Sequence, residues 1–281
     1  MKTNKYIIWG MTKSTIIHVF LLSVMMTCLF PIFWMVRSAF MTNETVFVDK
    51  GLIPHVLNFG NFAIAWTKGN FAVYFFNSVI YTVSVVGGIV LISSLAAFAF
   101  SRLDFPGKNV IFYLFVAAMM IPLPGSFVPL FVLMNKLGLI NTRFGYILCM
   151  INVGLSMSIL LLKTFFDKMP KDLEDAARID GCGKIGIWWH VALPLARPAI
   201  AVIVIFNSLS VWNEYILATL LLGDTKLMPL QRGVMIFQGA NSVDYPVLMA
   251  GLTMATIPIV MVYLAMQKHI VKGLSSGAVV G

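Results

Sequence analysis

Long apolar stretches separated by short polar segments dominate the pattern of this 281-residue chain. A helix that spans a lipid bilayer needs about 20 mostly apolar residues. Six stretches meet this requirement: Thr15–Val36, Val73–Phe100, Val110–Met134, Phe144–Phe166, Ala199–Leu222 and Tyr245–Gln267. The pattern therefore predicts an all-α polytopic membrane protein, with six transmembrane helices in a single transmembrane domain over residues 1–281.

Composition supports the same class of protein. The chain is 59% hydrophobic and 11% charged, with a mean hydropathy of +0.91, whereas soluble domains carry about 25% charged residues. The net charge of +9 does not indicate nucleic-acid binding, because Lys and Arg are enriched in the cytoplasmic loops of membrane proteins. With the N-terminus inside, 13 Lys and Arg residues fall in inner segments and seven in outer segments. This bias predicts that both termini are cytoplasmic.

One polar segment, Met169–Pro198, interrupts the apolar pattern and is placed by the charge bias on the cytoplasmic side. Its first half has acidic residues where the positive end of a helix dipole would lie, which predicts a short helix over Lys171–Asp180. Gly181-Cys182-Gly183 then predicts a break, and a second helix follows along the membrane surface. On the first helix Leu173, Ala176, Ala177 and Asp180 share one face. The segment is either a docking surface for a soluble partner or an amphipathic hairpin with no partner.

The residue types that hold metals or phosphates are not arranged for either task. Three cysteines and four histidines are scattered without ligand spacing. No G-x-x-x-x-G-K-[ST] motif occurs, so any ATP chemistry must belong to a partner. We therefore expect this chain to bind no metal and no cofactor of its own.

Several stretches resemble one family of membrane proteins. Asp175-Ala176-Ala177, followed by Gly181 and later by Leu193-Pro194, resembles the EAA loop of ABC-importer permeases. Further stretches are similar to the shorter, six-span permease subunit of the maltose-type carbohydrate importers: Ala99–Lys108, Leu137–Thr142, Trp212–Tyr215 and Val271–Gly281. The glutamate of the EAA triplet is replaced here by Asp175, which Glu174 precedes.

The resemblance implies a transporter subunit rather than an enzyme, in a bacterial or archaeal cytoplasmic membrane. Residues 169–198 would be the cytoplasmic coupling loop, seated in a cleft of the ATPase. Its contact residues would be Glu174, Asp175, Ala176, Ala177, Asp180, Gly181, Leu193 and Pro194. The implied partners are a second, related permease in a heterodimer, two ATP-binding subunits that hold ATP and Mg, an extracellular solute-binding protein and a carbohydrate substrate.

The C-terminal tail, residues 268–281, is a second candidate contact. The resemblance implies that its small residues, among them Gly273, Ser276 and Gly277, insert between the ATPase subunits. Composition alone also allows a disordered end.

The translocation pathway is predicted from irregular and polar positions within the spans. Ile121-Pro122-Leu123-Pro124-Gly125 cannot form a regular helix, and broken backbone at membrane depth lies against protein or a water-filled cavity. Pro124 and Ser126 are therefore candidate pathway residues, unless the kink is only packed by neighbouring helices.

Glu214 is the carboxylate that lies deepest in an apolar span, and such groups commonly mark function. Trp212 and Asn213 beside it offer a stacking face and an amide to sugar hydroxyls. Alternatively, Glu214 is a structural lock at a subunit interface. Asn152 and Ser156 could line the same cavity or bridge helices.

Three classes of function follow, in order of preference. The first is the permease subunit of a binding-protein-dependent carbohydrate importer, forming half of the pathway, with outer segments Phe40–Asn70 and Gly223–Asp244 facing the solute-binding protein. The second is a stand-alone, ion-coupled secondary transporter, which would want more intramembrane ionisable residues. The third is a membrane enzyme, for which no catalytic cluster is evident.

Overall fold

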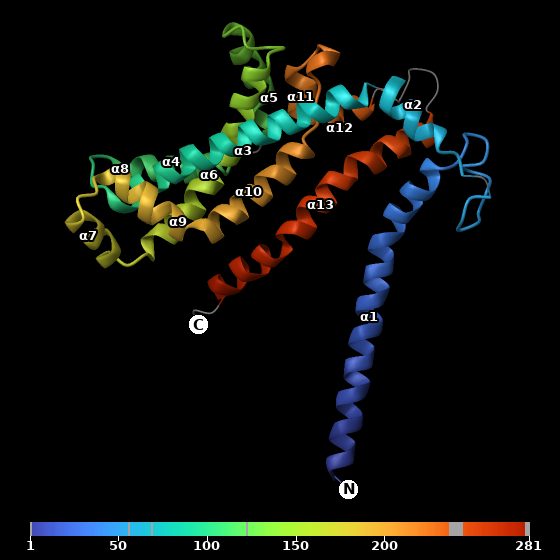
Figure 1. The fold of residues 1–281 in the computed structure, drawn as a ribbon, viewed down its shortest axis with the longest axis horizontal. Coiled ribbons are helices and arrows are strands. Elements are labelled where there is room, and N and C mark those ends of the chain that lie inside the picture. The colour runs from blue at the N-terminus through green and yellow to red at the C-terminus, as the bar shows by residue number, and fades with distance from the viewer. Residues whose placement is uncertain (1, 56, 69, 122, 236–243, 279–281) are drawn as a thin grey trace. The chain divides into compact units, whose positions relative to one another are not determined.

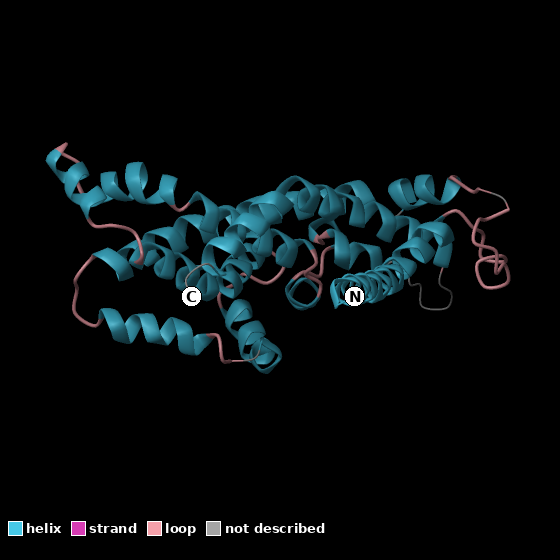
Figure 2. Ribbon diagram, turned by 90° about the horizontal axis from the view of Figure 1, so that it is seen from below, coloured by secondary structure: helices cyan, strands magenta, loops and turns pink. Residues whose placement is uncertain are grey.

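A computed structural model describes the backbone of residues 2–55, 57–68, 70–121, 123–235 and 244–278. Side chains are described for the same residues except 2–13, 68, 123, 124 and 265–278. Every regular element in this part of the chain is a helix (Figures 1 and 2). The helices are α1 (Lys2–Ala39), α2 (Gly60–Lys68), α3 (Phe71–Arg102), α4 (Lys108–Ala118), α5 (Leu123–Lys136), α6 (Arg143–Asp167), α7 (Asp172–Ile179), α8 (Lys184–Ile187), the π-helix η1 (Trp188–Ala192), α9 (Leu193–Leu195), α10 (Arg197–Trp212), α11 (Ile216–Leu221), the 3-10 helix η2 (Thr225–Leu227), α12 (Leu230–Val234) and α13 (Tyr245–Ala278).

Four of the six predicted spans correspond to single helices that are long and apolar enough to cross a membrane. These segments are Ser14–Ala39, Phe71–Arg102, Arg143–Asp167 and Tyr245–Leu264. The all-helical membrane class is therefore confirmed, whereas the count of six crossings stays a prediction.

The third predicted span, Val110–Met134, is not one helix, which agrees with the irregular backbone predicted for Ile121–Gly125. α4 ends at Ala118 and α5 begins at Leu123. The break has the expected cause, because proline has no N–H and its ring disfavours helical backbone in the residue before it. Pro124 is the second residue of α5, where a missing N–H leaves no hydrogen bond unmade.

The fifth predicted span, Ala199–Leu222, is also divided. α10 ends at Trp212, and α11 begins at Ile216 after a three-residue break. At its other end α10 begins at Arg197, and Pro198 occupies a first-turn position as expected for a helix start. The fifth span is therefore two helices rather than the single helix predicted from its apolar run.

The chain divides into two compact units: residues 1–69 with 234–254, and residues 70–233 with 255–281. In the second unit α3 and α6 run parallel. Tyr81 contacts Tyr146 near the start of both helices, with ring centroids 4.7 Å apart, and Phe98 contacts Phe166 near the end of both, at 6.0 Å. α10 packs against both helices. The prediction of a single transmembrane domain stays a prediction.

The parallel pair gives the second unit two distinct ends. At one end the chain leaves α3 and α6 and forms α7; we call this the α7 end. At the other end the first turns of α3 hold the loop around η2, which we call the η2 end. Asn77 donates to the carbonyls of Lys226 and Met228, and the hydroxyl of Tyr81 donates to that of Leu227.

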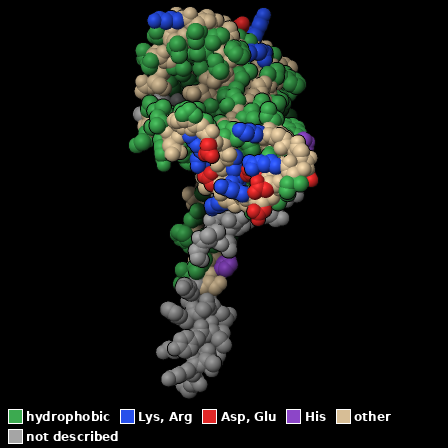
Figure 3. Space-filling model, turned by 90° about the vertical axis from the view of Figure 1, so that its left-hand side faces the viewer, with side chains coloured by type: hydrophobic (Ala, Val, Ile, Leu, Met, Phe, Trp, Pro, Cys, Tyr) green, Lys and Arg blue, Asp and Glu red, His purple; other side chains and the backbone are tan. Residues whose placement is uncertain are grey.

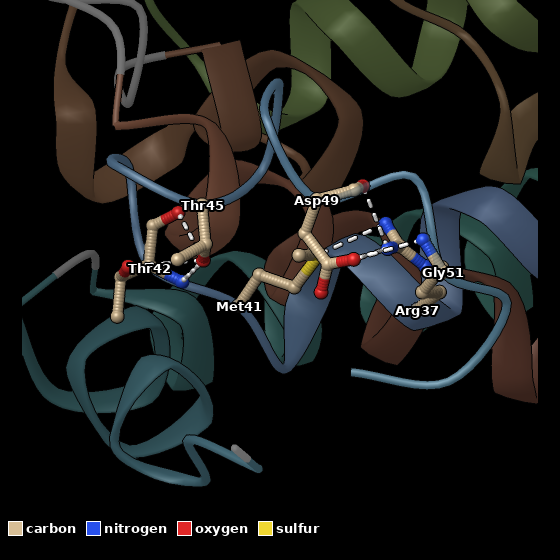
Figure 4. A network of polar contacts seen from close by, with 6 residues as sticks. All are labelled: Arg37, Met41, Thr42, Thr45, Asp49 and Gly51. Carbon is tan, nitrogen blue, oxygen red and sulfur yellow. Dashed lines mark hydrogen bonds and ion pairs between the residues drawn. The ribbon is translucent and has the colours of Figure 1, made fainter. Parts of the chain in front are cut away.

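In the first unit a buried arginine organises the segment that follows α1 (Figure 4). Arg37 donates from Nη2 to the carbonyl of Asp49, at 2.9 Å, and its guanidinium lies 4.8 Å from the ring centre of Trp34. The Asp49 carboxylate accepts from the backbone N–H of Gly51. Asn61 of α2 donates to the carbonyl oxygens of Ala39 and Met41. These contacts shape the predicted outer segment into a folded loop and one short helix.

Candidate functional site

The polar segment between α6 and α10 forms the predicted short helix, α7. Asp172, Glu174 and Asp175 lie in its first turn, where negative charge near the positive end of the helix dipole stabilises the helix. Gly181 ends the helix with a φ of 86°. Its N–H donates to the carbonyl of Arg178, and the N–H of Cys182 donates to that of Ala177, which is the Schellman arrangement. The predicted helix and the predicted break at Gly181 are confirmed.

The second half of the polar segment is a run of α8, η1 and α9 rather than one regular helix. Pro194 cannot donate to the carbonyl four residues earlier, and its ring crowds that carbonyl. The backbone adapts by forming a π-turn, in which the N–H of Leu193 donates to the carbonyl of Trp188. The run meets α10 at an angle of 76°. The helical run continues through Leu193-Pro194, and the bend comes two residues later at Ala196.

Glu174 points inward from α7. Its Oε1 lies 2.7 Å from Nε of Arg102, the last residue of α3, and both side chains are 6% exposed. Nη2 of the same arginine donates to the carbonyls of Phe166 and Met169 at the end of α6. One guanidinium thus joins α3, the end of α6 and α7.

Asp175 points away from the bundle, with its side chain 62% exposed, and pairs with Arg178 at 3.0 Å on the helix surface. Of the predicted face, Leu173, Ala176 and Asp180 are exposed, but Ala177 packs into the hydrophobic core. The prediction that Ala177 shares one face with these three residues was therefore wrong, because the helix turns Ala177 toward the bundle. Figure 3 shows acidic and basic side chains gathered at the α7 end, beside a largely hydrophobic surface.

Two features of this end were not assigned a role from the sequence. Arg102 lies in the Ala99–Lys108 stretch, and the signal that could have singled it out is a charged residue directly after an apolar run. Ile179 is 87% exposed and Ile185 is 75% exposed. Both side chains are available for contact with another protein.

The tail residues Gly273, Ser276 and Gly277 fall within α13, whose backbone continues to Ala278. Their side chains, and residues 279–281 altogether, lie outside the described part of the chain. Their proposed contact with an ATPase stays a prediction.

Glu214 lies in the break between α10 and α11 and not within a helix. Its Oε1 accepts from the N–H of Leu217 at 2.6 Å, and its Oε2 accepts from the N–H of Ala218 at 2.9 Å. The hydroxyl of Tyr146 on α6 donates to the same Oε2 at 3.1 Å. The carboxylate thus satisfies two orphan donors at the start of α11 and ties that helix to α6.

The other candidate pathway residues have different neighbours. Trp212 is buried, donates from its indole N–H to the carbonyl of Ala255 and meets Phe75 edge to face. Asn213 is exposed and donates to the carbonyl of Leu209. Asn152 is exposed, whereas Ser156 and Ser126 are half-buried; the side chain of Pro124 lies outside the described part. Asn213 also accepts from Nε2 of Gln231 at 3.4 Å. The two polar groups beside Trp212 thus bond to other parts of the chain, and a shared sugar site stays a prediction.

Among the described residues, no three His, Cys, Asp or Glu side chains come together in a way that could hold a metal ion.

The fold and its α7 end define a class: a membrane protein of several apolar helices with a short charged helix at one end of the bundle. The family described as the binding-protein-dependent transport system inner membrane component matches residues 88–276, and the chain belongs to this family.

Curated relatives extend the similarity to nearly the whole chain. The probable ABC transporter permease protein YurM of Bacillus subtilis is 35% identical over 95% of this chain and 89% of its own length. The diacetylchitobiose uptake system permease protein NgcG of Streptomyces coelicolor is 32% identical over 94% and 88%. A chain of a bacterial ABC transporter that imports the acidic polysaccharide alginate superposes with a TM-score of 0.79 at 26% identity, covering 93% of this chain and 96% of that one.

Proposed function

We propose that this permease carries a sugar or oligosaccharide, and that it forms half of the pathway together with a second, related permease. Two ATP-binding subunits and an extracellular solute-binding protein complete the importer. The support comes from family membership together with relatives whose names describe uptake of carbohydrates. ATP and Mg belong to the ATP-binding subunits.

The observation that carries the proposal is the form of α7. It is a short helix at the end of the bundle, closed by Gly181, with Asp175, Ala176, Asp180 and Ile179 exposed. A helix of this kind fits a groove on a soluble protein through an apolar contact with charges around it. We assign the contact with the ATPase to Asp175 rather than to Glu174, because the Glu174 carboxylate is already paired inside the chain.

The α7 end is proposed to lie in the cytoplasm, and six crossings are proposed in all. Because α3 and α6 are parallel, the chain between them must return from the α7 end to the η2 end. α4 and α5 make that return together, which makes them the third crossing. α10 and α11 make the fifth in the same way, starting from the α7 end.

The orientation is tested by labelling single cysteines in intact cells with a membrane-impermeant maleimide, in a chain whose native cysteines are replaced by serine. We expect Lys226→Cys at the η2 end to be labelled and Asp172→Cys on α7 to be labelled only after permeabilisation. Labelling of Asp172→Cys in intact cells would overturn the orientation and with it the role of α7.

The coupling role is tested by co-purifying the chain with its ATPase and measuring uptake with ATP hydrolysis in proteoliposomes. Asp175→Asn is expected to lower substrate-stimulated hydrolysis about tenfold, within the range of typical coupling free energies. Asp104→Asn is the matched control, since Asp104 is also exposed at this end but lies outside α7. Uptake driven by a proton or sodium gradient, with no ATPase present, would instead establish a secondary transporter.

A further inference from the structure

We infer that Arg102 is a positioning residue for energy coupling, because it fixes α7 to the ends of α3 and α6 so that a displacement of α7 moves both helices. The inference rests on the proposed function, in which α7 receives the motion of an ATPase. Motion of α7 would then reach α3 and α6 through Arg102, in addition to passing along the backbone to α10.

The geometry of Arg102 supports this role. Nε lies 2.7 Å from Oε1 of Glu174 in an ion pair, and Nη2 donates to the carbonyl of Phe166 at 2.6 Å and to that of Met169. The Phe166 carbonyl belongs to the last turn of α6, which ends at Asp167, and Met169 lies in the connection that leads to α7. A cation at a helix C-terminus and a carboxylate in a first helical turn are both favoured by the helix dipoles.

The attachment of α7 to the rest of the unit is otherwise narrow. The helix packs mainly against α8 and η1, which are parts of the same polar segment. Of its eight residues, Glu174 and Ala177 are the two that are buried. The ion pair with Arg102 is therefore the principal polar link from α7 to the long helices.

A neighbouring contact strengthens the same junction. The hydroxyl of Ser101 donates to Oδ1 of Asp167 at 2.7 Å, and Nζ of Lys163 donates to Oδ2 of that carboxylate, also at 2.7 Å. The last turns of α3 and α6 are thus joined directly, next to the point where Arg102 holds α7. A force on Glu174 therefore acts, through Arg102, on two helix ends that are already bonded to each other.

Arginine is required at this position for a geometric reason. Its planar group donates from Nη2 to two carbonyls while its charge lies beside the carboxylate of Glu174 in an ion pair. Lysine would keep the charge but has a single ammonium at the end of a flexible chain. Arg102→Lys should therefore preserve folding better than Arg102→Ala while loosening the junction.

The test uses the complete importer in proteoliposomes, with uptake and ATP hydrolysis measured together. Arg102→Lys and Glu174→Gln are expected to retain the ATPase and its basal hydrolysis but to lower the substrate moved per ATP about tenfold, as for a lost coupling interaction. Lys108→Gln is the control, because it removes a cation from an exposed ion pair with Asp104 at the same end. The double variant Arg102→Glu with Glu174→Arg should recover part of the ratio.

A distance measurement covers variants that assemble poorly. Spin labels at Ile179 on α7 and at Asp104 beyond α3 should give a narrow distance distribution in the native chain and a broader one in Arg102→Lys. An unchanged distribution, or a transport-to-hydrolysis ratio equal to that of the native chain, overturns the inference. If the native chain itself shows no ATP-driven uptake, the proposed function fails instead, so the two failures are distinguishable.

Discussion

The carboxylate of Glu214 and the hydroxyl of Tyr146 are joined by a hydrogen bond of 3.1 Å, and the same carboxylate caps the start of α11. Both carboxylate oxygens thus accept hydrogen bonds from donors of the same chain. This geometry differs from both readings of the sequence, a substrate-facing group and a lock between subunits. It favours an internal lock that sets the direction of α11 against α6.

Replacing Glu214 by glutamine should weaken this lock rather than change substrate preference. The amide has one acceptor oxygen, so its NH₂ group would face a backbone N–H that has lost its acceptor. We expect a loss of about 1–3 kcal/mol, the usual cost of an unsatisfied buried group, measured as a lower unfolding temperature in detergent.

Tyr146→Phe is the matched control for that prediction. It removes one hydrogen bond and leaves both backbone contacts of Glu214 intact, so it should cost about 1 kcal/mol. A shifted substrate profile in Glu214→Gln, with unchanged stability, would contradict the internal lock and restore the pathway role.

Gly181→Ala should disturb the end of α7. Gly181 has a φ of 86°, a left-handed conformation that costs a residue with a Cβ roughly 1–2 kcal/mol. The expected result is faster hydrogen exchange over residues 176–182 and reduced coupling of hydrolysis to uptake.

Gly183→Ala provides the comparison for Gly181. Its φ is −73°, and a Cβ there would meet nothing within 4 Å. We expect no loss, or a gain of up to about 1 kcal/mol from the stiffer unfolded chain. Equal effects of the two substitutions would show that the left-handed turn does not matter.

Gly154→Ala should separate α6 from α10. A Cβ at Gly154 would overlap Oδ1 of Asn207 and approach Cδ1 of Ile89 to 2.5 Å. Overpacking of this kind typically costs about 1–3 kcal/mol. Thermal unfolding of the purified complex measures the effect.

Gly87→Ala controls for the change of residue type in a helix. A Cβ at Gly87 meets nothing within 4 Å, and alanine in a helix interior is favoured over glycine by about 0.5–1 kcal/mol. If Gly154→Ala were as well tolerated as Gly87→Ala, the close approach of α6 and α10 would be refuted.

Arg37→Met should release the loop that follows α1. The Arg37 side chain is 1% exposed and lies 3.5 Å from Oδ1 of Asp49, and removing one partner of a buried pair costs about 3–5 kcal/mol. We expect new protease cleavage and faster hydrogen exchange between residues 40 and 59.

Lys50→Met in the same loop removes an equal charge from an exposed position. It should leave the protection of residues 40–59 against protease and hydrogen exchange unchanged. Protection of residues 40–59 that survives Arg37→Met would show that contacts other than the arginine hold the loop.

The sequence alone determined the features of this protein that depend on local chemistry. Apolar length predicted the four unbroken helices, because a bilayer demands a minimum run of hydrophobic residues. Acidic residues followed by Gly181 predicted α7, because dipole and turn preferences act within a few residues. The prolines around Pro122 predicted the irregular backbone between α4 and α5 for the same local reason.

Tertiary structure decided which way the polar side chains point and what they bind. Glu174 and Asp175 are adjacent carboxylates, and in the structure Glu174 points inward to Arg102, on another helix, whereas Asp175 points outward to Arg178. In the sequence, Glu214 is a charged residue inside an apolar run. In the structure it lies in the break between α10 and α11, where its carboxylate caps α11 and accepts a hydrogen bond from Tyr146. Such pairings join residues far apart in the chain, so hydrophobic periodicity and local propensity carry no information about them.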